Sequence, residues 1–276
     1  MTNKNLFSYK PENSNQKIWQ VYPDPKSEFI VLEIREKQKQ KYISQLLVLD
    51  TEKEKVFAIA EMEATQTLVN FFDKTILLSE IDFQNEMPIA KGLQALNMDF
   101  ETIWELEEVS YYGIWEEKHQ TQNIEKVIFS LQENYYSVPL KLDANSSKEE
   151  VEASQENYNN LQSKIKQYFY STQEYSTNHI NYKDIASFIL EKAKHKVKES
   201  IFYVENDNYL VCSFLVEYKE NKFKNYLLCT DRKGIIQTYF LIKDIEKEGK
   251  KNPQELILMK NKILWIDENE FHFLSI

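Results

Sequence analysis

The sequence predicts an all-β protein of about five small antiparallel sheets, with a helical insertion at about residues 146–198. Short runs rich in β-branched and aromatic residues recur along the chain, as in "EFIVLEI" and "KVIFSL". An acidic or amide residue ends several of these runs at a nearly constant spacing, and one long polar stretch has helical periodicity instead. Such strands with regular turns favour an antiparallel fold within one domain, residues 1–276. A β-sandwich and an α+β fold are the alternatives.

Composition narrows the class of protein and of partner. The chain is 42% hydrophobic and 28% charged, which is typical of a globular protein. A net charge of −10 repels phosphate backbones and anionic lipid, so we expect neither nucleic acid nor a membrane as partner. The first residues, "MTNKNLFSYKPENSNQK", lack the apolar core of a signal peptide, which favours a cytoplasmic location. We expect Cys212 and Cys229 to be buried free thiols, with a disulfide as the alternative.

The repeat that sets the number of sheets is carried by residues at strand ends. Asp50, Asn97 and Asp143 are spaced by 47 and 46 residues, Asp231 follows after 88, and Asp267 after a further 36. A spacing of about 45 residues is that of one four-stranded blade of a β-propeller. The sequence therefore predicts a propeller-like ring of about five blades.

Two further features concern how the strands pack. An apolar or aromatic residue follows three of the repeat marks at a similar distance: Phe57, Trp104 and Tyr239. This pattern predicts hairpins whose second strand packs an aromatic side chain against the next sheet. We expect the ring to close by pairing of the N-terminal "LFSYK" with the C-terminal "FHFLSI".

The segment after Asp143 breaks the strand pattern. In "SSKEEVEASQENYNNLQSKIKQYFY", Ser147 and Glu150 have the spacing of a capping box, which predicts a helix. A second helix, capped by Asn181, is predicted in "NYKDIASFILEKAKHKV". The apolar stripe of the first helix is Val151, Tyr158, Leu161, Ile165 and Tyr168, and that of the second is Ile185, Phe188, Ile189 and Val197.

At "LLVLDTEKEKVF" and "GLQALNMDFETIW" the chain resembles the repeat of pyrroloquinoline-quinone-type propellers, in which a strand ending in Ala-Leu-Asp leads through a turn to a Trp-ended strand. The order of "IWQVYPDPKSEFIVLEIRE", the first repeat and "MPIAKGLQALNMDFETIWE" is similar to a family of uncharacterised Bacteroidetes proteins known as a domain of unknown function. Glu54 or Glu101 replaces the usual turn glycine. The resemblance implies a fold and not a cofactor, and about half the length of a quinone dehydrogenase is missing, so we expect no quinone. We expect no metal either, because metal-ligand spacings are absent.

The candidate ligand-binding residues are Glu33 and Arg35, which share one face of the strand "FIVLEIREK" and are able to grip a ligand carboxylate there. A solvated strand-end pair is the alternative. The basic run Lys192–Lys198, with His195, is a second candidate, for an anion, or else only the cationic end of a helix. A surface for a peptide or a sugar is a third, built from Trp19, Trp104 and Trp115, with packing between blades as the alternative.

Catalytic and metal motifs are not recognised. The histidines lack metal-ligand spacing, and adjacent acids such as Glu107 with Glu108, or Glu116 with Glu117, point to opposite faces of a strand. No catalytic residue is therefore assigned. We expect a monomeric, non-catalytic scaffold that binds a protein partner. A carbohydrate-active hydrolase or lyase and a small-ligand sensor are the alternatives, because one fold hosts all three.

Overall fold

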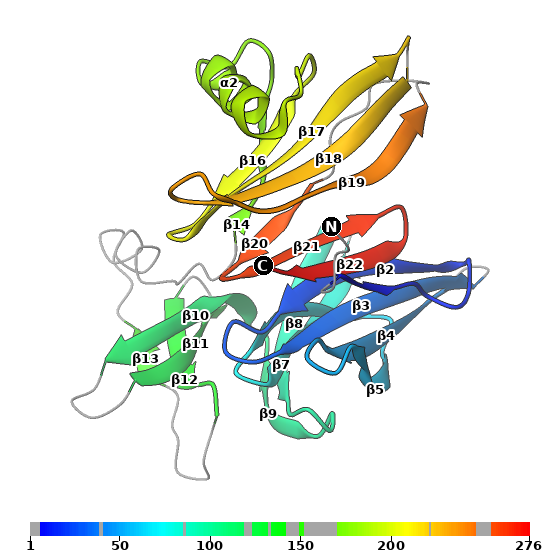
Figure 1. Ribbon diagram of the computed structural model, residues 1–276. Helices are drawn as coiled ribbons and strands as arrows, with labels where there is room; N and C mark the ends of the chain where they lie inside the picture. Colours follow the sequence, from blue (N-terminus) through cyan, green and yellow to red (C-terminus); the bar gives the residue numbers. More distant parts are fainter. Residues whose placement is uncertain are drawn as a thin grey trace. The chain divides into compact units, whose positions relative to one another are not determined.

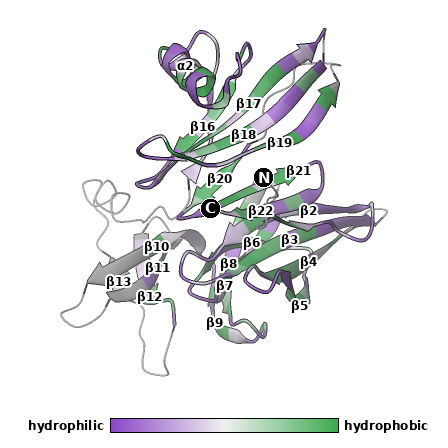
Figure 2. Cartoon of the chain, viewed as in Figure 1, coloured by the Kyte–Doolittle hydropathy of each residue, from purple (hydrophilic) through white to green (hydrophobic). Residues whose placement is uncertain are grey.

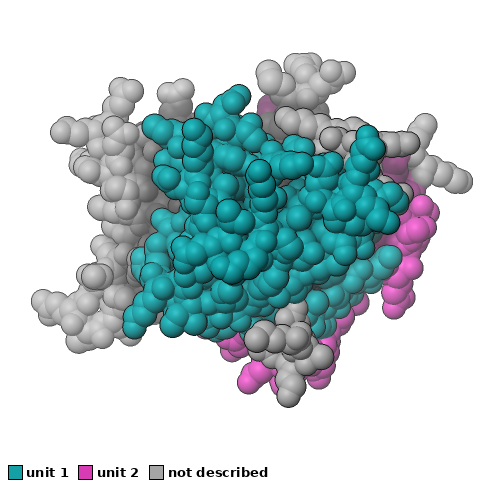
Figure 3. Space-filling view, turned by 45° about the horizontal axis from the view of Figure 1, so that its top comes forward, with its two compact units in different colours: residues 1–10, 168–276 teal, residues 11–167 magenta. Residues whose placement is uncertain are grey.

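The structure is a computed structural model, and it describes residues 6–38, 41–84, 87–118, 123–131, 134–141, 149–151, 170–220, 222–246 and 255–276. The chain divides into two compact units (Figure 3). Unit 1 comprises residues 1–10 and 168–276, and unit 2 comprises residues 11–167. The single domain expected over residues 1–276 stays a prediction. In the described part of the chain, no helix is long and apolar enough to cross a membrane.

The described residues of unit 2 form three four-stranded antiparallel sheets, each made of strands that follow one another in sequence (Figure 1). The first sheet contains β2 (Gln16–Pro23), β3 (Phe29–Gln38), β4 (Lys41–Asp50) and β5 (Lys55–Met62). The second contains β6 (Gln66–Phe72), β7 (Thr75–Gln84), β8 (Met87–Leu96) and β9 (Thr102–Glu107). The third contains β10 (Ser110–Lys118), β11 (Asn123–Leu131), β12 (Asn134–Pro139) and β13 (Glu149–Val151).

Unit 1 contains two five-stranded antiparallel sheets and helix α2 (Tyr182–Ala193). The fourth sheet contains β15 (Gln173–Tyr175), β16 (Ile201–Glu205), β17 (Tyr209–Lys219), β18 (Lys222–Asp231) and β19 (Ile236–Glu246). Hydrophilic and hydrophobic bands alternate along β17, β18 and β19 (Figure 2), as expected for strands whose side chains point to opposite faces in turn. The fifth contains β14 (Tyr170–Ser171), β20 (Ile257–Met259), β21 (Lys262–Asp267), β22 (Glu270–Ser275) and β1 (Leu6–Tyr9).

The five small antiparallel sheets confirm the all-β, propeller-like class, and the pairing of the two chain ends is confirmed as well. Strand β1 pairs with β22, with Leu6 opposite Leu274 and Tyr9 opposite Phe271. The fifth sheet therefore takes one strand from the N-terminus and the others from the C-terminal half. Joining the ends in one sheet covers an edge of β22 that would otherwise be open.

Three of the repeat marks are turn caps. The side-chain oxygen of Asp50 accepts hydrogen bonds from the backbone N–H groups two and three residues on, at 3.1 and 3.0 Å. Asn97 and Asp231 accept equivalent bonds from backbone N–H groups two and four residues on. A residue with positive φ completes each turn: Glu54, Phe100 and Gly234. Glu54 thus occupies a left-handed turn position, whereas in the second sheet that position is Phe100 and not Glu101.

One repeat mark is wrong and another lies outside the described residues. Asp267 ends β21, so it begins the turn between β21 and β22. The turn equivalent to those after Asp50 and Asn97 is absent from the fifth sheet, because there the chain ends supply separate strands. Asp143 lies outside the described residues.

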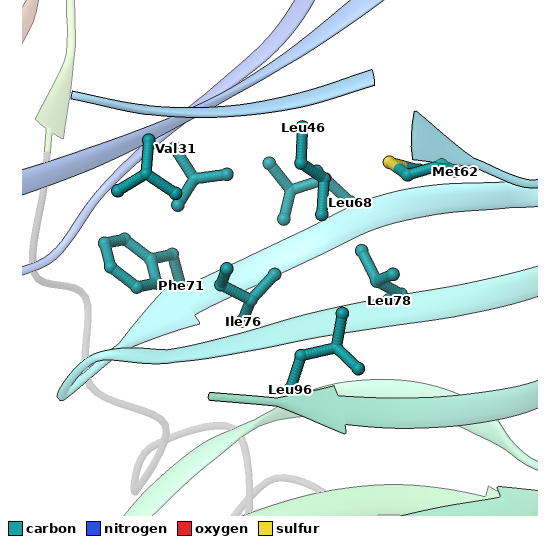
Figure 4. Packing of buried hydrophobic residues seen from close by; sticks show 9 residues of the cluster. Val31, Leu46, Met62, Leu68, Phe71, Ile76, Leu78 and Leu96 are labelled. Atoms are coloured by element: carbon teal, nitrogen blue, oxygen red, sulfur yellow. The ribbon is translucent and has the colours of Figure 1, made fainter. Parts of the chain in front are cut away.

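The apolar residues that alternate along the strands of the first two sheets form a common core between these sheets. Val31 and Leu46, from the first sheet, face Leu68, Phe71 and other apolar residues of the second (Figure 4). Val48, Met62, Ile76, Leu78 and Leu96 complete this cluster. Burial of each such side chain contributes about 1.5–3 kcal/mol. This packing fixes the distance between β3 and β6, on which the polar site described below depends.

Of the three aromatic residues predicted to pack against the next sheet, Phe57, Trp104 and Tyr239, only Trp104 is buried. A β-bulge interrupts the last strand of three sheets, at Phe57, Ile103 and Gln237. Trp104, the residue after its bulge, is 6% exposed and donates its indole N–H to the Leu140 carbonyl at 3.1 Å. Phe57 is itself a bulged residue and is 45% exposed, so its position is not equivalent. Tyr239 is half-buried.

The helical insertion is confirmed in its second half. Helix α2 begins after Asn181, whose side chain makes no capping hydrogen bond. Ile189 and Val197 are buried, and Ile185 and Phe188 pack against the same cluster of unit 1.

The predicted start of the first helix is wrong. Glu149–Val151 is a strand that pairs with β12, so Glu150 closes no capping box. The open edge of β12 offers backbone pairing that overrides the local helical signal. The remaining stripe residues Tyr158, Leu161, Ile165 and Tyr168 lie outside the described residues.

The two cysteines confirm the expectation of buried free thiols. Val211 lies opposite Cys229 and Cys212 lies opposite Leu228, so the two side chains point to opposite faces of the fourth sheet. A disulfide between them is therefore excluded by geometry. Burial raises the pKa of Cys229 to about 12, and the carboxylate of Asp231 adds to the shift.

Candidate binding surface on the first strands of unit 2

The first strand of each sheet in unit 2 contains a β-bulge. The extra residues are Trp19 in β2, Val69 in β6 and Tyr112 in β10. A bulge sets two residues against one on the neighbouring strand and re-aims their side chains. In β2 the register resumes with Gln20 opposite Glu33, which places the Gln20 amide near the contact between the first two sheets.

Glu33 is completely buried, and its carboxylate joins the first sheet to the second. One oxygen accepts hydrogen bonds from the backbone N–H of Leu68 at 2.9 Å and from the Thr67 hydroxyl at 3.0 Å. The other accepts the Nε–H of Arg35 at 2.5 Å. A buried carboxylate is costly unless it is paired and hydrogen-bonded, and these three donors satisfy it. Solvated placement, the alternative interpretation of this pair, is wrong for Glu33.

Arg35 lies between this buried network and the surface. Its Nη2 donates to the Thr67 hydroxyl oxygen at 3.2 Å, and its guanidinium carbon lies 4.5 Å from the ring centroid of Trp19. The Arg35 side chain is 22% exposed, whereas Trp19 is 56% exposed. Glu33 and Thr67 therefore hold the guanidinium plane in place, and the guanidinium in turn supports an exposed indole ring.

Two lysines extend this arrangement. Lys17 lies opposite Arg35 in the β2–β3 register, and Lys37 follows Arg35 by two residues on the same face of β3. Both are exposed. Lys17, Trp19, Arg35 and Lys37 are named here the Trp19–Arg35 surface. It is a basic and aromatic face on a chain with a net charge of −10.

A second polar group lies on the same first strands. The Asn70 amide donates to the Tyr111 hydroxyl oxygen at 2.5 Å, and the Asn70 carbonyl oxygen accepts the backbone N–H of Phe71 at 2.7 Å. Burial raises the pKa of Tyr111, an effect that the hydrogen bond from Asn70 opposes and the nearby Tyr22 increases. Burial also raises the pKa of Tyr22, and the carboxylate of Glu33 adds to it. Both phenols are therefore neutral at physiological pH.

The basic run Lys192–Lys198 does not form one cluster. Its first residues end helix α2, where Lys194 adopts a left-handed conformation with φ 61°. His195 stacks on Tyr226 with ring centroids 4.8 Å apart, and burial lowers its pKa. Lys198 pairs with Glu217 at 2.9 Å. These positions fit the cationic helix end better than an anion site.

The remaining candidate residues, which are the histidines, Trp115 and the paired acids, are either not brought together or not described. In the residues that the structure describes, no group of three or more His, Cys, Asp or Glu side chains is placed to hold a metal ion. His119 lies outside those residues, and the Trp115 side chain is not described. Glu107 ends β9, and Glu108 follows it with φ 57° in a turn.

The sequence named Glu33 and Arg35 as candidate ligand-binding residues, which stays a prediction, and it did not reveal the residues that hold them in place. Thr67 and Gln20 belong to the network, and the Gln20 amide donates to the Thr67 hydroxyl oxygen at 3.1 Å. Simple alternation along β2 places Trp19 on the same face as Lys17 and Gln20 on the opposite face. The bulge at Trp19 instead brings Gln20 opposite Glu33, and no local sequence pattern reveals this bulge. Inter-blade packing, the alternative for the three tryptophans, is right for Trp104 and wrong for Trp19.

Comparisons with known proteins assign no family. No family model matches the chain, and no curated protein matches it. Two solved structures align over the whole chain at 7% identity: Sqt1 of Saccharomyces cerevisiae, with all of its chain covered and a TM-score of 0.31, and apo AztD of Citrobacter koseri, with 93% covered and a TM-score of 0.26. These scores are too low to support any inference about activity or ligand, and the likeness to the Bacteroidetes family and to quinone-type repeats stays a prediction.

Proposed function

We propose that this chain is a non-catalytic, propeller-like scaffold that binds a protein partner at the Trp19–Arg35 surface. The observation that carries the proposal is the exposed Trp19 indole held against an Arg35 guanidinium that is itself anchored by buried groups. Tryptophan and arginine are the residues most enriched at the energetic centres of protein interfaces. A rigid pair loses little side-chain entropy when a partner covers it.

The burial of Glu33 explains how such a surface is maintained. An exposed arginine on a strand ordinarily samples many rotamers, whereas Arg35 is fixed by Glu33 on one side and Thr67 on the other. The proposed role of Glu33 is therefore to position Arg35, and the partner contacts are made by Arg35 and Trp19. The proposal places the protein in the cytoplasm, where the free thiols of Cys212 and Cys229 stay reduced.

Site-specific photo-crosslinking in the native host tests the proposal. A photoreactive phenylalanine analogue replaces Trp19 in one variant and Ile59 in the other. Ile59 is a matched control because it belongs to the same unit and is 57% exposed. We expect a discrete protein adduct from position 19 that is missing from position 59.

The adduct is then identified and its partner purified for binding measurements. We expect Trp19→Ala to weaken the affinity of that partner by tenfold or more, and Ile59→Ala to leave it within twofold. Equal adducts at both positions, or unchanged affinity for Trp19→Ala, would overturn the proposal.

A further inference from the structure

The charges around Trp19 indicate which kind of protein segment fits the Trp19–Arg35 surface. Lys17, Arg35 and Lys37 lie on one face of the first sheet, and the only acid described on that face of β3 is Glu33. Within β2 and β3, three cations against one carboxylate give this face a net charge of +2, whereas the whole chain carries −10. A basic face on an acidic protein attracts anionic partners locally while the rest of the molecule repels them.

Burial divides the cations into two kinds. The Glu33 carboxylate has no exposed surface and its oxygens are hydrogen-bonded, so it compensates Arg35 from below. Lys17 and Lys37 are exposed, and in the β2–β3 register both lie beside Arg35 on the same side of Trp19 along the strands. Glu36, the next acid along β3, points to the opposite face of the strand and accepts a hydrogen bond from Gln38 at 3.0 Å.

The spacing of these groups matches an extended chain. Lys37 follows Arg35 by two residues, which corresponds to about 7 Å along a strand, and Lys17 lies across from Arg35 at about 5 Å between Cβ atoms. Acidic side chains two residues apart in an extended peptide have the same spacing as Arg35 and Lys37. The indole is large and flat, so it is suited to cover one apolar or aromatic side chain of that peptide.

We propose that the partner segment is an extended acidic peptide with one aromatic residue beside its acids, which stacks on Trp19 while its carboxylates pair with Lys17, Arg35 and Lys37. This inference rests on the proposed function, because it names the chemistry of the partner bound at the same surface. Binding of this kind is faster and tighter at low ionic strength, since exposed charges steer the encounter and are screened by salt.

Fluorescence anisotropy with labelled synthetic peptides tests the inference on the full-length chain. The probe is a seven-residue peptide of alternating Asp and Glu with a central Phe. The control peptides replace the acids by Asn and Gln in one case and by Lys in the other. We expect saturable binding of the acidic peptide in 20 mM salt, at least tenfold weaker binding in 500 mM salt, and no saturable binding of either control.

Charge reversals localise the site. Lys17→Glu combined with Lys37→Glu should weaken binding of the acidic peptide at least tenfold, whereas Lys55→Glu, an exposed lysine on β5 of the same sheet, should change it less than twofold. A circular-dichroism melt of each variant establishes that it is folded. Equal effects of the two reversals, or equal binding of the acidic and neutral peptides, would overturn the inference.

The outcomes separate this inference from the proposed function. If photo-crosslinking at position 19 captures a partner whose binding ignores both salt and the lysine reversals, the scaffold function stands and the acidic peptide is wrong. If position 19 captures nothing and the peptide also fails to bind, both are wrong.

Discussion

Removal of the Glu33 carboxylate is the sharpest test of the structure. In Glu33→Ala the backbone N–H of Leu68, which now donates to Glu33 at 2.9 Å, loses its acceptor in a buried place. An unsatisfied buried donor costs about 1–3 kcal/mol. Breaking a buried ion pair costs about 3–5 kcal/mol, and the 22% exposure of Arg35 reduces this because water solvates the freed guanidinium. We expect a loss of about 2–4 kcal/mol in the free energy of unfolding.

Urea unfolding followed by tryptophan fluorescence and by circular dichroism measures that loss, and hydrogen exchange reports on Leu68 directly. Glu33→Gln should cost about half as much, because its amide oxygen still accepts the Leu68 N–H. Glu36→Ala, on the opposite face of the same strand, should stay within about 0.5 kcal/mol. Should Glu33→Ala lose less than about 0.5 kcal/mol with Leu68 exchange unchanged, the buried network around Glu33 does not exist.

Three further predictions concern the repeat, the thiols and the chain ends. Burial of the Asp50 carboxyl acts to raise its pKa, but hydrogen bonds from Lys53 and Glu52 lower it overall, so its stabilising contribution is present above about pH 4 and is lost as the pH falls further. Asp50→Ala should cost about 1 kcal/mol in urea unfolding at pH 7 while Asp50→Asn, which copies the second sheet, costs less than half of that. Cys212 and Cys229 should resist a thiol reagent at pH 8 in the folded protein and react fully in urea. Because the pKa of Cys229 is raised to about 12, its contribution to stability should hold below about pH 9 and decline between about pH 9 and 12; rapid labelling of the folded protein would contradict this. Deletion of residues 1–9 removes β1 and should lower the melting temperature and promote aggregation through the uncovered edge of β22, whereas deletion of residues 1–5 should not; equal melting of both would refute the role of β1.

Features that depend on a few neighbouring residues were predictable from the sequence. The caps at Asp50, Asn97 and Asp231 form within one turn, because a short acceptor side chain bonds backbone N–H groups two to four residues on. Helix α2 was predictable for the same reason, since its apolar residues lie at helical spacing. The pairing of "LFSYK" with "FHFLSI" was predicted as the closure of the ring of sheets.

Tertiary structure decided the features in which distant strands meet. Glu33 and Arg35 share a face by simple alternation, yet only the approach of β6 buries Glu33 and supplies Leu68 and Thr67 as donors. The bulge at Trp19 is set by the register with β3, so no local pattern reveals that Gln20 turns toward the same network.

Contacts between distant strands also explain the two wrong predictions, which concern Asp267 and the start of the first helix. Asp267 resembles the other marks in its local sequence, but the strand order of the fifth sheet places it in a different turn. Glu149–Val151 has a local helical signal, and the free edge of β12 captures it as a strand. The sequence by itself therefore determined the turns, the alternation of strands and the number of sheets, because these arise from short-range bonds and burial patterns. Only the tertiary structure decided which charges are buried and which aromatic side chain is exposed, because both depend on what a distant strand brings to the same place.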